Sequence, residues 1–176
     1  MNIIIRQETE KDYKLSETVV EKAFKNAEHT DHKEHLLVAK LRKSDAFIPE
    51  LSLVAELDGE IVGHIMLTKL LIENEGSKYD SLALAPVSVV PEHQNKGIGS
   101  ELISESLKIA KELGFKSVIV LGHDKYYPRF GFKPASTWGI KAPFDVPDEA
   151  FMALELEDGS LEDISGTVVY SKEFSE

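Results

Sequence analysis

The sequence of 176 residues contains no cysteine. Disulfide bonds, thiolate nucleophiles, cysteine-ligated zinc sites and iron–sulfur clusters are therefore excluded together. Long apolar runs are lacking as well. Only Ile3, Ile4 and Ile5 stand together before Arg6, too short for the roughly 7–15 residues of a signal-peptide core, and no run approaches the roughly 20 residues of a membrane span. We expect a cytoplasmic protein without a membrane partner.

Positive charge is scarce relative to negative charge: 20 Lys and Arg residues stand against 31 Asp and Glu residues, a formal net charge of −11. Such a surface repels a phosphate backbone, so we expect no nucleic-acid partner. It can attract a cationic amine, although solubility alone also accounts for it. The length suits one domain. We expect a single domain over residues 1–176, with a core at about 2–133 and a C-terminal segment at 134–176.

Hydrophobic periodicity predicts an α/β protein with the element order βααβββαβαββ. An antiparallel meander at the front and a βαβ crossover behind it indicate a mixed central sheet with helices on both faces. Asp58-Gly59 between two apolar runs is the strongest short hairpin signal. The expected strands are residues 2–6, 51–57, 60–73, 81–90, 116–122, 151–157 and 166–174, and the expected helices are 12–27, 32–44, 102–114 and a short one after 123.

The segment QNKGIG, residues 94–99, joins an apolar run to an amphipathic run. A helix N-terminus offers unpaired N–H groups and positive dipole charge, and glycine lets a ligand approach the backbone. Together they favour an anion site, most often for phosphate. A P-loop would need Gly-Lys-Ser/Thr, which is absent, and a dinucleotide fingerprint would need a third glycine where Leu102 stands. A turn with glycines for packing alone is the alternative.

Two motifs together carry a family resemblance. QNKGIG matches the pattern [QR]-x-x-G-x-[GA] and resembles the coenzyme A pyrophosphate loop of the GCN5-related N-acetyltransferase (GNAT) superfamily. YYPRFGF, residues 126–132, resembles the Y-x-x-x-G-F element of the same family, with Tyr127 at the tyrosine position. The element order is similar to that family along nearly the whole chain. Both segments look like those of a bacterial subgroup of predicted N-acetyltransferases.

The resemblance implies an N-acetyltransferase that moves the acetyl group of acetyl-CoA, a cosubstrate, to a primary amine by direct transfer in a ternary complex. It assigns the backbone N–H of Val87 to polarising the carbonyl and Tyr127 to the role of general acid. A packed aromatic is the plainer role for Tyr127, and an exposed loop lysine is the plainer role for Lys96. The implied cofactor contacts are Val87, Ser88, Val89, Gln94, Asn95, Lys96, Gly97, Ile98, Gly99 and Ser100.

The general base has no obvious candidate. Histone-acetylating members carry a glutamate four residues before the position of Val87, and here that position is Ala83. Another residue, a water relay or an already neutral amine must serve instead. Ser88 is a poor base, whereas histidine titrates near neutrality. The other candidates are Glu56, His64, His123 and His29, each of which also suits a structural or exposed role.

The region between the first two expected helices holds His29, Asp31, His32 and His35. These residues lack the HExxH spacing, so no metal is predicted. The acidic residues Glu28, Asp31 and Glu34 can attract an amine if the loop borders the acceptor site, as in the family. The acceptor is a small-molecule or protein amine, with Trp138, Phe144 and Phe151 either lining its site or packing in the core. The family also pairs through C-terminal strands, which would make a homodimer.

Two other functions compete with this interpretation. A non-catalytic CoA-binding module, a sensor or partner protein, would share the fold and the loop, because fold does not fix function. A nucleotide-binding regulator would share the anion loop but lacks the lysine and magnesium-binding residues that it needs.

Overall fold

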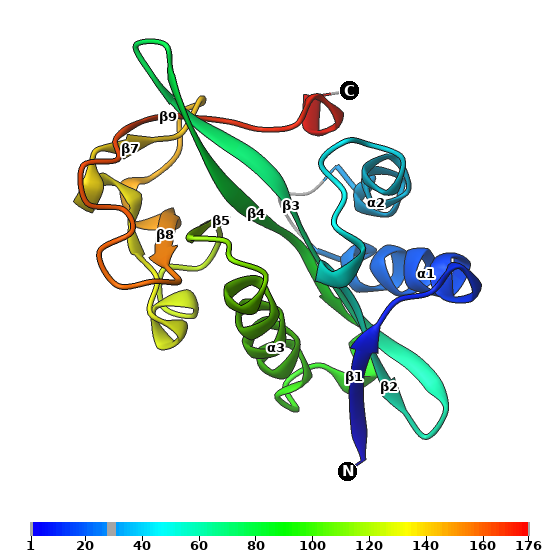
Figure 1. The fold of residues 1–176 in the computed structure, drawn as a ribbon. Coiled ribbons are helices and arrows are strands. Elements are labelled where there is room, and N and C mark those ends of the chain that lie inside the picture. Colours follow the sequence, from blue (N-terminus) through cyan, green and yellow to red (C-terminus); the bar gives the residue numbers. More distant parts are fainter. Residues whose placement is uncertain (1, 28–30, 176) are drawn as a thin grey trace. The chain divides into compact units, whose positions relative to one another are not determined.

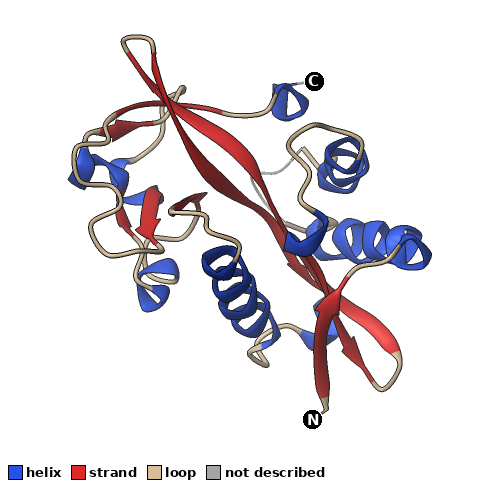
Figure 2. Ribbon diagram, viewed as in Figure 1, coloured by secondary structure: helices blue, strands red, loops and turns tan. Residues whose placement is uncertain are grey.

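A computed structural model describes residues 2–27 and 31–175 (Figures 1 and 2). It has the mixed α/β fold that was expected, in the expected order. The strands are β1 Ile3–Gln7, β2 Ser52–Leu57, β3 Glu60–Asn74, β4 Ser77–Val89, β5 Ser117–Leu121, β6 Lys133–Pro134, β7 Ile140–Lys141, β8 Phe151–Glu155 and β9 Gly166–Val169, and the α-helices are α1 Tyr13–Phe24, α2 Glu34–Arg42 and α3 Ile98–Glu112.

The chain packs as two compact units. Two of their boundaries fall inside the long strands β3 and β4 and a third inside α3, so each of these elements contributes residues to both units. The first unit takes in Met1–Thr68, Ala85–Ile109 and Glu173–Glu176, and the second takes in Lys69–Leu84 and Ala110–Lys172.

In the first unit, β1 and the start of β3 flank β2, and both pairs are antiparallel. The turn between β2 and β3 is Asp58-Gly59, with φ of 51° and 84°. A two-residue hairpin turn of this kind needs positive φ at both positions, which Asp tolerates and Gly adopts freely. The hairpin predicted from Asp-Gly is confirmed.

Helices cover both faces of the sheet in this unit. A Cβ on Gly63 would lie 3.0 Å from Leu102 Cδ1, so α3 approaches β3 on the face of Gly63. Successive strand residues point to opposite faces. Met66, on the other face, packs with Val38 and Leu41 of α2 in a fully buried cluster that α1 joins. The expected arrangement of helices is confirmed here.

In the second unit, β4 runs parallel to β5, with Ala83 opposite Ile119. The chain between these strands includes α3, so the predicted βαβ crossover is present. Strand β8 is antiparallel to β5, and β9 is antiparallel to the end of β3. Strands β6 and β7 were not predicted, because two residues are too few to show a periodicity.

Several expected boundaries were wrong. The turn after β3 is only Glu75-Gly76, with φ of 48° and 87°, so β4 begins at Ser77 rather than at 81. Helix α3 begins at Ile98 rather than at 102. The short helix after 123 is the 3₁₀ helix η4, Tyr127–Phe130. It ends at Gly131, whose left-handed φ of 102° stops a helix.

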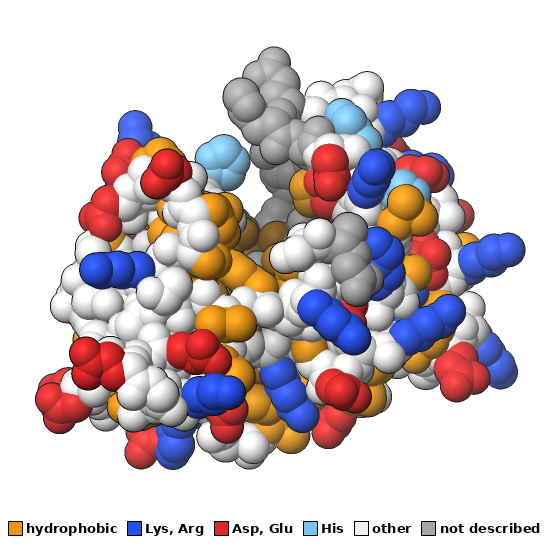
Figure 3. Space-filling view, turned by 90° about the horizontal axis from the view of Figure 1, so that it is seen from above, with side chains coloured by type: hydrophobic (Ala, Val, Ile, Leu, Met, Phe, Trp, Pro, Cys, Tyr) orange, Lys and Arg blue, Asp and Glu red, His pale blue; other side chains and the backbone are white. Residues whose placement is uncertain are grey.

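On the face shown in Figure 3, acidic and basic side chains are interspersed with one another. The net negative charge is therefore not concentrated in one acidic patch on this face. None of the helices within residues 2–27 and 31–175 combines the length and the apolar character needed to traverse a bilayer.

Candidate functional site

The link between β4 and α3 starts where the sheet ladder ends. Val90 N–H, just after β4, donates to Val62 O of β3 at 2.9 Å. A 3₁₀ turn, η3 (Pro91–His93), follows, and His93 N–H closes it by donating to Val90 O at 3.0 Å. The proline supplies a fixed φ for the first position of this turn. The chain thus leaves the sheet in a set direction before it reaches the glycines.

The turn that follows uses two left-handed residues, Asn95 with φ 65° and Gly97 with φ 83°. The first backbone bond inside α3 runs from Glu101 N–H to Gly97 O at 3.1 Å. The N–H groups of Ile98 and Gly99 precede it and lie in the unpaired first turn of the helix. A Cβ on Gly97 would meet no protein atom within 4 Å. The helix terminus therefore presents donors and open space to an anion.

Two side chains shape this loop. Gln94 Nε2 donates to Val89 O at 2.9 Å, which ties the loop to the end of β4. Lys96 is exposed, and its Nζ lies 3.4 Å from His93 Nδ1. Within the described part of the chain, Lys96 has no carboxylate partner. Its charge is therefore available to an anion at the helix terminus.

The strand residues before the loop alternate in exposure. Val87 and Val89 are half-buried, whereas Ser88 is buried at 3% exposure. The Ser88 side chain points into the protein, so Ser88 can meet an external ligand only through its backbone. All of the predicted cofactor contacts, from Val87 to Ser100, lie in the first unit around the junction of β4 and α3.

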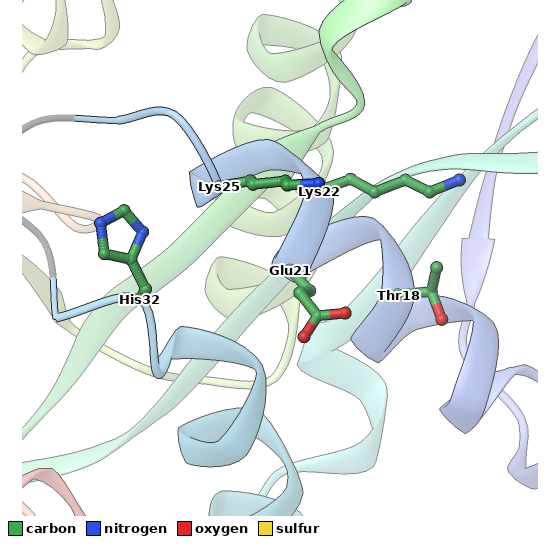
Figure 4. A pocket seen from close by; sticks show the side chains of 5 residues that line it. All are labelled: Thr18, Glu21, Lys22, Lys25 and His32. Carbon is green, nitrogen blue, oxygen red and sulfur yellow. The ribbon is translucent and has the colours of Figure 1, made fainter.

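A surface depression of about 540 Å³ lies along α1 in the same unit (Figure 4). Glu21 in its wall pairs with His35 at 3.3 Å, whereas Lys22 and Lys25 form no ion pair with any described residue. A smaller hollow of about 150 Å³ includes Lys22 together with Val90 and His93 at the loop. Lys22 and Lys25 were not predicted as part of a hollow, although their i, i+3 spacing places them on one face of α1. Its lining is Thr18, Glu21, Lys22, Lys25 and His32.

Tyr127 belongs to the second unit, at the start of η4. Its ring is 7% exposed and packs against the rings of Tyr126 at 5.2 Å and Phe132 at 5.7 Å. Burial, with a smaller contribution from Tyr126, raises the pKa of Tyr127 to about 12. The hydroxyl has no hydrogen-bond partner among residues 2–27 and 31–175. It is therefore a protonated donor at neutral pH.

Two neighbours fix the position of this ring. Gly122, just after β5, leaves room for it: a Cβ there would collide with the Tyr127 ring. Tyr126 packs edge-on against the Tyr127 ring, and the Arg129 guanidinium stacks on the Tyr126 ring at 4.4 Å. The choice of Tyr127 over Tyr126 stays a prediction, and the two tyrosines occupy clearly different surroundings.

The residues considered as general base differ sharply in their surroundings. Glu56 is tied to Arg6 through Oε1, at 2.9 and 3.1 Å. His64 is fully buried, and His123 is exposed in the second unit. Ala83 is 2% exposed, and His29 lies outside the described residues. His64 is therefore shielded from direct contact with an external amine, whereas Glu56, with 24% of its side chain exposed, is not.

The segment before α2 is described from Asp31 onward. Among the described residues, no group of three His, Cys, Asp or Glu side chains could hold an ion. Asp31 Oδ1 accepts from Lys33 N–H at 2.9 Å, and Glu34 opens α2. Glu28, the third expected acid of this segment, lies outside the described residues.

The C-terminal aromatics fall into two groups. Phe151 is 4% exposed, in the core of the second unit, while Phe144 is 45% exposed. Their rings lie 6.5 Å apart, and Phe144 also faces Tyr170 at 6.2 Å. Phe144 can therefore contact a ligand, while Phe151 packs in the core.

Known proteins match this arrangement. The acetyltransferase (GNAT) family matches residues 10–132. The uncharacterized N-acetyltransferase YjhQ of Escherichia coli K12 is 41% identical over 118 residues, which make up 66% of this chain and 65% of that protein. The chain thus spans slightly less than two thirds of this curated relative.

Two solved structures of other proteins have a fold similar to that of this chain over nearly its whole length. A GNAT family acetyltransferase from Brucella melitensis in complex with acetyl-CoA is 34% identical, with a TM-score of 0.81 over 98% of both chains. The N-acetyltransferase YhbS of Escherichia coli in complex with CoA is 25% identical, with a TM-score of 0.84 over 100% of this chain and 93% of that chain. The chain belongs to the acetyltransferase (GNAT) family.

Proposed function

We propose that this protein binds acetyl-CoA and transfers its acetyl group directly to a primary amine in a ternary complex. The observation that carries the proposal is the glycine turn at the N-terminus of α3, where Gly97 leaves open space in front of helix N–H donors. A pyrophosphate fits the donors of such a terminus. The complexes of the two related structures with acetyl-CoA and CoA support the same ligand.

Each part of the proposed site has one task. Backbone N–H groups from Asn95 to Ser100 hold the pyrophosphate, and the exposed Lys96 adds charge. The backbone N–H of Val87 donates to the thioester carbonyl oxygen and stabilises the negative charge that develops there. Val87 and Val89 offer their backbone to the pantetheine arm as a neighbouring strand would.

Tyr127 completes the proposed chemistry. Its pKa of about 12 lies above the ordinary pKa of a thiol, about 8.5, so complete proton transfer from the phenol to the leaving thiolate is uphill. Tyr127 therefore acts as a hydrogen-bond donor that stabilises the thiolate as the C–S bond breaks. The acceptor is a small-molecule or protein amine.

A pair of glycine variants tests cofactor binding. Gly97 and Gly59 have almost the same left-handed φ, 83° and 84°, and a Cβ on either would meet no protein atom within 4 Å. Alanine at either position costs about 1–2 kcal/mol of left-handed strain. We expect Gly97→Ala to weaken acetyl-CoA binding at least tenfold in calorimetric titration and Gly59→Ala to leave it unchanged. Equal binding by both variants, or no preference for acetyl-CoA over ATP and NAD, would contradict the proposal.

A pair of tyrosine variants separates an enzyme from a CoA-binding module. Tyr127→Phe removes the donor, which lowers kcat about a hundredfold if the hydroxyl stabilises the leaving group. Tyr126→Phe keeps the ring that stacks on Arg129 and is expected to retain kcat. Release of the CoA thiol measures both. Saturable acetyl-CoA binding without turnover on any amine would favour the non-catalytic module.

A further inference from the structure

The hollow along α1 takes most of its wall from one face of the helix (Figure 4). Thr18, Lys22 and Lys25 are spaced i, i+4 and i+7, so they lie in one row that spans about 10 Å along the helix axis. The hollow measures about 540 Å³, within the roughly 300–1,000 Å³ of small-molecule sites. It therefore has room for a molecule the size of an amino acid or a dipeptide.

The carboxylate of Glu21 is directed to α2 rather than to the two lysines of this wall. Glu21 stands four residues before Lys25, the spacing at which a glutamate and a lysine pair favourably on a helix. Its Oε2 instead lies 3.3 Å from His35 Nε2 of α2. Among the residues that the structure describes, Lys22 and Lys25 form no ion pair, so both charges are available to a ligand.

Two lysines three residues apart on one helix face repel each other unless an anion lies between them. A lysine ammonium only donates hydrogen bonds, so its partner is an acceptor, and carboxylate and phosphate oxygens are the strongest such acceptors. An anion between Lys22 and Lys25 would receive donors from both and relieve their repulsion. Departures of this kind from local preference are typical of functional sites.

The end of the hollow at His32 is fixed by bonds within the protein. His32 Nδ1 lies 2.8 Å from Phe24 O, and a carbonyl oxygen only accepts, so Nδ1 is the donor. The next turn is held by Asp31 Oδ1, which accepts from Lys33 N–H at 2.9 Å. The wall at this end therefore does not need a ligand to hold it in place.

The hollow continues toward the cofactor loop. Thr18 and Lys22 also line the smaller hollow, whose wall includes Val90, four residues before the loop at 94–99. Val90 comes three residues after Val87, on the strand proposed to hold the thioester. Both hollows belong to the first unit. Because direct transfer requires the acceptor to bind beside the cofactor, this continuous surface along α1 suits the acceptor.

The charges along the two hollows change sign. Glu60 and Glu92 line the smaller hollow, near the loop, and neither forms an ion pair within residues 2–27 and 31–175. Lys25 lines the larger hollow alone, and Lys22 lines both. An ammonium group therefore fits the end near the loop, and an anionic group fits the end at Lys25.

We infer that the acceptor is an amine that also carries an anionic group, a carboxylate or a phosphate, and that Lys22 and Lys25 bind this group. The inference rests on the function proposed above and names its substrate class. Wholly cationic acceptors such as polyamines and aminoglycosides are disfavoured, because both lysines repel them.

The two lysines bind the acceptor and take no part in the bond changes. An acceptor that binds as an ammonium first loses a proton to solvent. The amine nitrogen then bonds to the acetyl carbon as the C–S bond breaks, and a second amine proton ends on the CoA sulfur. The anionic group keeps its charge throughout, so its bonds to Lys22 and Lys25 lower KM and leave kcat nearly unchanged.

Acceptors that differ only in the anionic group test the substrate class. L-lysine, L-methionine and L-phenylalanine are each compared with their amides, and O-phosphoethanolamine is compared with ethanolamine; spermidine and kanamycin represent cationic acceptors. Release of the CoA thiol at saturating acetyl-CoA gives kcat/KM. We expect kcat/KM to be at least tenfold higher for the anionic member of a pair. The pair that shows this preference identifies the group as a carboxylate or a phosphate.

Variants of the wall locate that preference. Lys22→Gln and Lys25→Gln are each expected to raise KM for the preferred acceptor about tenfold and to leave KM for its neutral partner unchanged. Lys22→Arg keeps the charge and is expected to retain most of the preference. Lys14→Gln is the matched control, because Lys14 is an exposed lysine of α1 that lines neither hollow.

Calorimetric titration of the same acceptors into protein saturated with CoA measures binding without turnover. Binding that depends on the anionic group and that Lys22→Gln weakens, but without turnover, supports the inferred ligand and contradicts acetyl transfer. Turnover with equal kcat/KM within every pair, or best with spermidine or kanamycin, overturns the inference and leaves the proposed transfer standing. Lysine variants that affect both members of a pair alike overturn it as well. Neither turnover nor binding with any acceptor overturns both proposals.

Discussion

Replacing Glu8 with Gln tests the buried charge against which Arg42, Ser52 and His64 lie. The substitution keeps the side-chain volume and removes the negative charge that Arg42 and His64 face at 2.6 and 3.6 Å. Removing one partner of a buried pair typically costs about 3–5 kcal/mol, because the other charge stays buried without compensation. We therefore expect Glu8→Gln to fold with clearly reduced stability.

The pKa of Glu8 gives a second value for the stability that its charge contributes to the folded protein. Its value falls from 4.5 to about 2 on folding, a change of about 2.5 units, and at 1.36 kcal/mol per unit this amounts to about 3 kcal/mol. A carboxylate whose pKa is lowered on folding contributes its stability above its unfolded value. That contribution is present above about pH 4.5 and is lost as the pH falls toward 2.

Urea denaturation followed by circular dichroism measures the effect at pH 7 and at pH 3. The gap between wild type and Glu8→Gln should be about 3 kcal/mol at pH 7 and clearly smaller at pH 3. Glu157→Gln is the control, since Glu157 pairs with Lys116 where both side chains are about 60% exposed, and no measurable change is expected. A gap below 1 kcal/mol at pH 7, or one that does not vary with pH, would refute the assignment of Glu8 as an ionised partner.

Two further glycine variants probe close contacts. Gly63→Ala places a Cβ 3.0 Å from Leu102 Cδ1 and 3.2 Å from Ser88 O, so we expect thermal denaturation to show a loss of about 1–3 kcal/mol; an unchanged melting temperature would mean that α3 is free to move away. Gly122→Ala drives a Cβ into the Tyr127 ring, so kcat should fall while calorimetry shows unchanged acetyl-CoA affinity; retained kcat would argue against a role for Tyr127.

Local signals in the sequence predicted much of the fold. Asp58-Gly59 carries its own turn chemistry, and the glycines of residues 94–99, between an apolar run and an amphipathic run, indicated a strand-to-helix junction. Boundaries were less well predicted. Glu75 adopts a left-handed φ of 48° beside Gly76, and nothing local distinguishes this two-residue turn from the longer polar turn that was expected.

The buried cluster around His64 was beyond local reasoning. Glu8, Arg42 and Ser52 meet only in the folded chain; Glu8 and Arg42 are 34 residues apart in sequence. His64 was one base candidate among several because its residue type suits the role, and the type says nothing about burial or partners. The Glu8 carboxylate accepts hydrogen bonds from Arg42 and Ser52, which only the tertiary structure brings to it.

Ala83 shows why a base has to come from elsewhere in this chain. It is 2% exposed and stands opposite Ile119 in the parallel pairing of β4 and β5, beside Leu82 opposite Val118. A carboxylate placed there would be buried among apolar strand residues, and an unpaired buried carboxylate is kept neutral rather than ionised. A carboxylate can stay ionised in an interior when cationic and hydroxyl donors surround it, as Arg42 and Ser52 surround Glu8. The chain keeps its buried negative charge where those donors are, and His64 lies beside it, with Nε2 3.6 Å from Glu8 Oε2.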